Sequence, residues 1–115
     1  MTPDSNECRK DFLAIRDALD ILSGKWKIMI IVSLFFGKKR FKELERDVEG
    51  ITAKMLSKEL RDLEMNKIVK RTVFDTKPVT VEYEITEHGK SLEKLVRELI
   101  AWGICHRKRI FENQD

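Results

Sequence analysis

The chain contains little of what several protein classes depend on. Two cysteines are too few for a disulfide scaffold, which favours a reducing compartment. The longest apolar run, residues 28–36, is too short to span a bilayer and is interrupted by Ser33. The first ten residues are polar and lack the pattern of a signal peptide. We therefore expect a cytoplasmic protein with no membrane partner.

Few residues in the sequence suit catalysis or metal binding. There are only two histidines and two cysteines, and there is no glycine-rich phosphate-binding loop. Cys105 and His106 are adjacent, so on a helix their side chains would diverge by about 100° and chelate a metal poorly. We predict no enzymatic activity, no metal site and no cofactor. A length of 115 residues suits one domain.

Positive charge is concentrated in the middle of the chain. Residues 38–71 carry eleven Lys and Arg against seven Asp and Glu, a net charge of +4, whereas the whole chain carries +3. The segments on either side are close to neutral. A polyanion would therefore dock on this central segment, although its seven acidic residues weaken the signal.

The central segment contains an amphipathic helix, predicted over residues 51–66. Leu56, Leu60 and Leu63 form one apolar stripe at helical spacing. Thr52 follows a glycine and can cap the helix with its hydroxyl. A shorter helix, residues 41–48, precedes it. Helix, glycine turn and basic helix is the layout of a helix-turn-helix that reads DNA. The candidate DNA-contacting residues are Thr52, Lys54, Ser57, Lys58 and Arg61.

The remaining segments extend this layout into a winged helix. We predict a flexible arm over residues 1–10 and a single domain over residues 11–115. Within the domain, helices are expected over residues 11–22 and 25–36, a β-hairpin over 68–85, and a last helix from Thr86 to about Phe111. The β-branched residues of 28–32 would also suit a buried strand, and the length of the run and the following Gly37 favour the helix. A hairpin directly after the second helix of the motif is the wing. The predicted fold class is mainly α with a small β-hairpin wing.

A second group of cations is suited to the DNA backbone. Lys38, Lys39 and Arg40 lie just before the helix over residues 41–48, where a helix N-terminus already favours anions. Lys77 lies at the expected tip of the hairpin. Phosphate contacts of this kind position a protein on DNA without specifying sequence. The alternative is that the basic run is only a solubilising loop.

The two terminal helices carry more apolar residues than one core requires. In the first, Phe12, Ile15 and Leu19 lie at helical spacing, and Leu13 widens the face. The last helix carries seven apolar residues between Leu92 and Ile104 that cover more than one face. A second copy of the chain is the simplest partner that could cover the apolar surface left over by the core. We therefore expect a homodimer formed by the N- and C-terminal helices, with an ordinary core helix as the alternative for residues 11–22.

The sequence resembles the HxlR-type winged-helix regulators of bacteria over about residues 11–104. The resemblance rests on combined motifs rather than on any one of them. The matching segments are ALDILSGKWK at residues 18–27, RFKEL at 40–44, GIT at 50–52, MLS at 55–57, LRDLE at 60–64, VKRT at 69–72, Pro78, VEY at 81–83, TEHG at 86–89 and Trp102.

The resemblance implies a dimeric transcription factor that binds a palindromic double-stranded DNA operator. It also implies that the terminal helices form the dimer interface. Many family members respond to oxidants or electrophiles through a cysteine in a C-P-V triplet. This chain has Leu13 at that position, and Cys8 lies five residues upstream without the following Pro-Val.

Thiol chemistry therefore has two open interpretations. Cys8 is followed by Arg9 and Lys10, and Cys105 is followed by His106 and Arg107, and positive neighbours favour the reactive thiolate. If the terminal helices of two subunits are neighbours, Cys8 and the partner's Cys105 can form a disulfide between chains. Otherwise, the two cysteines are unrelated thiols.

Two further functions remain as alternatives. A winged helix can be a protein–protein adaptor, although an adaptor would more often carry apolar or acidic residues in place of Lys54, Lys58 and Arg61. A regulator can also respond to a small-molecule effector bound between the dimer helices, near Trp26 or Trp102.

Overall fold

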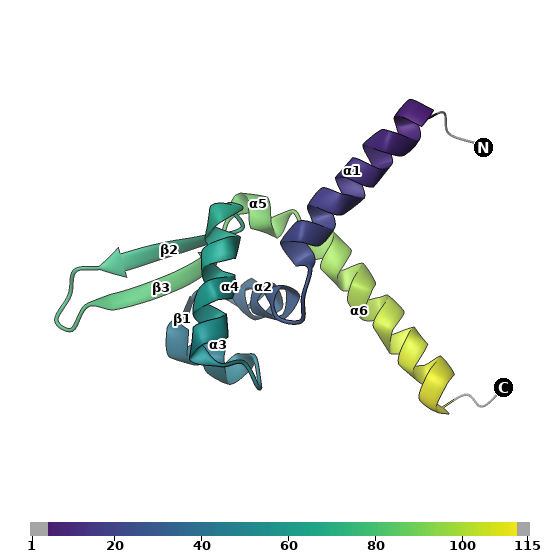
Figure 1. Cartoon of the computed structure of the whole chain (residues 1–115). Helices are drawn as coiled ribbons and strands as arrows, with labels where there is room; N and C mark the ends of the chain where they lie inside the picture. The colour runs from purple at the N-terminus through teal and green to yellow at the C-terminus, as the bar shows by residue number, and fades with distance from the viewer. Residues whose placement is uncertain (1–4, 113–115) are drawn as a thin grey trace.

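The computed structural model describes residues 5–112 and shows a small winged-helix body from which two long helices project (Figure 1). The elements are α1 (Ser5–Leu22), α2 (Lys27–Phe35), β1 (Lys39–Arg40), α3 (Phe41–Asp47), α4 (Ala53–Met65), β2 (Val69–Phe74), β3 (Thr80–Ile85), α5 (Glu87–Lys90), α6 (Glu93–Arg107) and a terminal π-helical turn, η1 (Lys108–Glu112). This confirms the predicted fold class.

The core forms around α2, which is apolar on nearly every side. Ile30, Ile31 and Leu34 are fully buried, as expected for a central helix. The rest of the core comes from Leu22 at the end of α1 and from α3, α4 and the base of the hairpin, which pack around α2. Their buried residues are Leu44, Val48, Ile51, Leu56, Leu60, Leu63, Ile68, Val69 and Tyr83.

The predicted hairpin is present and forms part of a three-stranded antiparallel sheet in the order β1-β3-β2. Val69 pairs with Ile85 at its base, and Phe74 pairs with Thr80 near its tip. The third strand, β1, lies in the basic run that was predicted only as a loop or phosphate clamp. Its two residues pair with Tyr83 and Glu82 of β3, so the sheet connects the wing to the start of α3.

The prediction of one continuous last helix is wrong. It is divided into α5, α6 and η1. Thr86 caps its start as expected, because its hydroxyl accepts from the Gly89 N–H at 2.9 Å. The same hydroxyl donates to the Lys67 carbonyl at 2.6 Å, which holds α5 against the base of the hairpin. Gly89 is buried there, and a β-carbon at this position would lie 2.5 Å from the Ile68 carbonyl oxygen.

The two terminal helices leave the body in different directions, α1 toward the top of the view and α6 toward the bottom (Figure 1). Helix α1 begins at Ser5, so residues 5–10 continue the helix instead of belonging to the predicted arm. Glu7 in the first turn suits a helix start, and Arg9 and Lys10 are good helix formers. The predicted arm at residues 1–4 lies outside the described residues.

Candidate nucleic-acid interface

The helix α4 is anchored by leucines and begins at a side-chain cap. Thr52 has an extended backbone, and its hydroxyl accepts from the Met55 N–H at 3.1 Å. Leu56, Leu60 and Leu63 are buried against the core. Gly50 has a φ of 92° and allows the tight turn between α3 and α4. These contacts aim the opposite face of α4 toward solvent.

The outward face of α4 carries unpaired donors. Lys54, Ser57, Lys58 and Arg61 are all exposed. Within residues 5–112, none of the four has a hydrogen-bond or ion-pair partner. Three cations and a hydroxyl on one helical face therefore remain available to an anionic ligand.

The cations predicted to contact the DNA backbone have different environments. Lys77 is exposed in the turn of the hairpin, and the side chain of Lys38 is mostly exposed, with its Nζ 4.0 Å from Glu84. Arg40 is exposed in β1, and its backbone N–H donates to Glu43 at 2.9 Å, which begins α3. Lys39 differs, because its Nζ lies 2.6 Å from Asp47 Oδ2 and its side chain is only 21% exposed.

Asp47 forms a polar junction between three elements. It accepts from the Ser33 hydroxyl of α2 at 2.7 Å and from Lys39 of β1. The hydrogen bond from Lys39, supported by that from Ser33, lowers the pKa of Asp47 below its usual value. This network fixes the end of α3 against α2 and the sheet, and no sequence motif indicated it.

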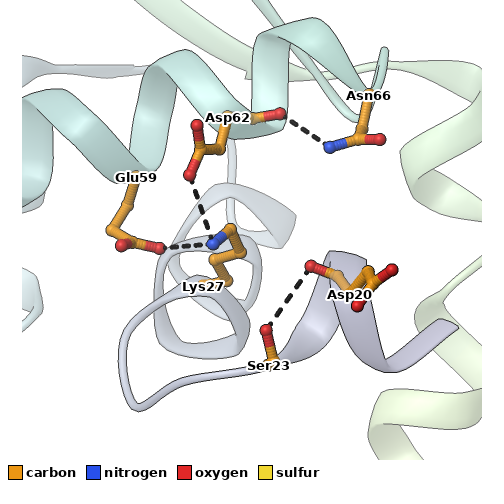
Figure 2. A network of polar contacts seen from close by, with 6 residues as sticks. All are labelled: Asp20, Ser23, Lys27, Glu59, Asp62 and Asn66. Carbon is orange, nitrogen blue, oxygen red and sulfur yellow. Dashed lines mark hydrogen bonds and ion pairs between the residues drawn. The ribbon is translucent and has the colours of Figure 1, made fainter. Parts of the chain in front are cut away.

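A second network connects α2 to α4 and was also missed (Figure 2). Lys27 Nζ lies 2.9 Å from Glu59 Oε2 and 3.5 Å from Asp62 Oδ2. Hydrogen bonding to Glu59 raises the pKa of Lys27, although burial opposes the shift. A signal was present in the sequence, since Glu59 completes the spacing of three and four residues with Leu56, Leu60 and Leu63.

The two thiols lie on the projecting helices. Cys8 is half-buried in the first half of α1, and Cys105 is exposed in the last turn of α6. Since these helices diverge (Figure 1), the two thiols of one chain do not meet. The ring of Trp102 stacks on His106 at 4.8 Å beside Cys105.

Across residues 5–112, the structure shows no cluster of three or more His, Cys, Asp or Glu that could hold a metal ion. No helix in the described part of the chain is long and apolar enough to cross a membrane.

Comparison with known proteins agrees with this geometry. Residues 21–111 match the HxlR-like helix-turn-helix family. The chain is 41% identical over 105 residues to the HTH-type transcriptional regulator YtcD of Bacillus subtilis, covering 91% of this chain and 83% of YtcD.

Solved structures show the same likeness. The reduced form of the redox regulator HypR superposes with a TM-score of 0.80 at 39% identity, covering 84% of this chain and 96% of HypR. Diamide-treated YodB from B. subtilis superposes with a TM-score of 0.68 at 40% identity, covering 76% and 86% of the two chains. The chain therefore belongs to the HxlR-like helix-turn-helix family of transcriptional regulators.

Proposed function

We propose that the protein is a sequence-specific, homodimeric regulator whose helix α4 enters the major groove of a palindromic operator. The observation that carries this proposal is the outward face of α4. Lys54, Lys58 and Arg61 are exposed and without partners in the described residues, on a helix that is rigidly capped and anchored. A protein–protein adaptor would more often carry acidic or apolar residues at these three positions.

The residues of this face divide by chemistry. Lysine and arginine side chains favour guanine O6 and N7, and a good bidentate pair discriminates by roughly 1–3 kcal/mol. Ser57 accepts or donates and is less selective. Lys38, Arg40 and Lys77 are suited to phosphates that flank the groove. We leave Lys39 out of this set, because its ion pair with Asp47 supports a structural role.

Exposed apolar side chains on the two projecting helices support a homodimer. Phe12 of α1 is 69% exposed and Trp102 of α6 is 67% exposed. Large exposed apolar patches rimmed by polar residues mark interaction sites, and most soluble oligomers are symmetric copies of one chain. The other exposed apolar residues of these helices are Leu13, Ile15, Leu19, Leu95, Leu99, Ile100 and Ile104.

Selection from a pool of random duplex DNA tests the proposal. We expect the purified protein to enrich a palindrome whose half-sites lie about 34 Å apart, one helical turn, or a multiple of it. Binding to the enriched duplex should weaken steeply with salt. Sedimentation velocity on the same sample should give the mass of a dimer. If no sequence is enriched and binding does not respond to salt, DNA reading is refuted and the adaptor function is favoured.

We also propose that oxidation joins Cys8 to Cys105 of the partner subunit. The two thiols lie on the helices assigned to the dimer interface, and HypR is described as a redox regulator. In this step the two thiols lose two protons and two electrons to an oxidant such as diamide, and one S–S bond forms. A bond between chains would change how the terminal helices pack and thereby the separation of the two α4 helices.

Non-reducing electrophoresis after diamide treatment tests the bond. We expect a dimer-sized band in the wild type that disappears with reductant and is missing in Cys8→Ser and in Cys105→Ser. A band of wild-type intensity in Cys8→Ser must be formed by Cys105 alone and would contradict the bond to Cys8. The absence of a dimer-sized band in the wild type would refute the bond while leaving DNA binding untouched.

A further inference from the structure

Lys27 occupies an unfavourable position for a cation. It is the first residue of α2, where the helix dipole disfavours positive charge, and the rest of that helix is almost entirely apolar. Its side chain is only 11% exposed, and that of its partner Glu59 is 10% exposed. Taking two such charges out of water costs free energy that their attraction barely returns. An apolar pair of similar volume would serve the core equally well, so stability alone does not account for Lys27.

The ion pairs of Lys27 depend on direction, whereas the apolar contacts that make up the rest of the packing between α2 and α4 do not. Leu56, Leu60 and Leu63 are held by burial, which tolerates small rotations of a helix. In contrast, Lys27 Nζ is bound to Glu59 at 2.9 Å and approaches Asp62 at 3.5 Å (Figure 2). Two acceptors almost one turn apart on α4 fix both the rotation of that helix about its axis and its position along the axis.

The network is placed between the DNA-facing and the projecting parts of the molecule. Glu59 and Asp62 each follow directly on a residue of the outward face, Lys58 and Arg61 respectively. On the other side, a cavity of about 240 Å³ is bordered by Lys27, Asp62 and Asp20, the last of which lies near the end of α1. A rotation of α4 that lengthens the Lys27 contacts would carry the outward face with it.

We propose that Lys27 is a positioning residue whose ion pairs with Glu59 and Asp62 set the orientation of α4 and thereby determine how well the protein discriminates its operator from other DNA. The inference rests on the proposed reading of DNA by α4. It assigns to Lys27 no contact with DNA.

The double variant Lys27→Met/Glu59→Met separates positioning from stability. It replaces the buried pair with apolar side chains of similar length, and Asp62 stays solvated because its side chain is 38% exposed. We expect unfolding in urea at or above the wild-type midpoint. Affinity for the duplex selected by the wild type should fall about tenfold, whereas affinity for a scrambled duplex and the salt dependence should not change.

A matched control is Lys90→Met/Glu87→Met, which removes an exposed lysine–glutamate pair on α5. It should leave the ratio of operator to scrambled affinity unchanged. If Lys27→Met/Glu59→Met folds and keeps that ratio, or loses affinity for both duplexes equally, the inference is overturned. If that variant does not fold, Lys27→Arg keeps the charge but changes its geometry, and an unchanged ratio in Lys27→Arg overturns the inference as well. A wild type that selects no duplex refutes the proposed function, and the inference with it.

Discussion

Replacing Lys58 with alanine distinguishes a phosphate contact from a base contact on the outward face of α4. The side chain is exposed and has no hydrogen-bond or ion-pair partner within residues 5–112, so its loss removes nothing from the fold. Surface substitutions of this kind change stability by less than about 0.5 kcal/mol. Any change in DNA binding therefore reports on the interface.

The size of the effect follows from counterion release. Each neutralised phosphate contributes about −0.9 to the slope of log K against log salt concentration. A homodimer presents Lys58 twice, so losing a phosphate contact should reduce the slope by about 1.8. Between about 50 and 200 mM salt, the wild type should then lose about twelvefold more affinity than the variant. Loss of a base contact should instead relax the preference at one base pair by roughly 1–3 kcal/mol.

Fluorescence anisotropy on the selected duplex at four salt concentrations measures the salt slope. The same titration with duplexes altered at single base pairs measures the base preference. Lys90→Ala is the charge-matched control, since Lys90 lies on α5 and is paired with Glu87. Its slope should equal that of the wild type. If Lys58→Ala changes neither the slope nor any base preference, Lys58 does not touch DNA, and the assignment of this face of α4 to the groove is refuted.

Three further predictions concern the elements that hold the interface. Thr52→Ala should lower the free energy of unfolding by about 1 kcal/mol in urea titrations, because a backbone N–H loses its cap, whereas Thr52→Ser should not. Gly89→Ala should lower it by about 1–3 kcal/mol, because the new methyl meets the Ile68 carbonyl, and an unchanged urea midpoint would contradict this. Because the pKa of Asp47 is lowered in the folded state, its carboxylate stabilises the fold at pH values above 3.8, the ordinary pKa of an aspartate. This contribution is lost as the pH falls through the pKa of the folded state. The difference in urea midpoint between the wild type and Asp47→Asn should therefore shrink from pH 7 to about pH 3, and a constant difference would contradict the assignment.

Much of the fold was predictable because its helices and hairpin have strong local patterns. The leucine spacing of α4 and the alternation of β3 each identify an element without knowledge of its neighbours. The apolar run of α2 also suited a buried strand, and its length and the glycine that follows it favoured the helix. The break between α5 and α6 has no such signal. It lies just after buried Gly89, where α5 packs closely on Ile68, a contact between residues distant in sequence. Periodicity continues through such a break, because apolar residues remain at helical spacing on both sides.

The sequence did not reveal the partners of the charged residues. Lys39 belongs to a basic run and was therefore predicted to contact the DNA backbone, and the pairing of β1 with β3 also brings it beside Asp47. That pairing joins segments about forty residues apart and is invisible locally. Glu59 received no role from the sequence, although its spacing from the leucines places it on the buried face of α4.

The buried lysine network and the projecting helices address one physical problem. A dimeric DNA reader must hold two recognition helices at a separation and tilt that match successive major grooves. The proposed packing of α1 and α6 against a second copy would set the separation. The tilt depends on how α4 sits on α2, and apolar packing alone leaves that angle loosely defined. The directional contacts of Lys27 supply the missing constraint, and they lie next to the end of α1 (Figure 2). We therefore expect changes in the packing of α1 to alter operator discrimination in the wild type more than in Lys27→Met/Glu59→Met.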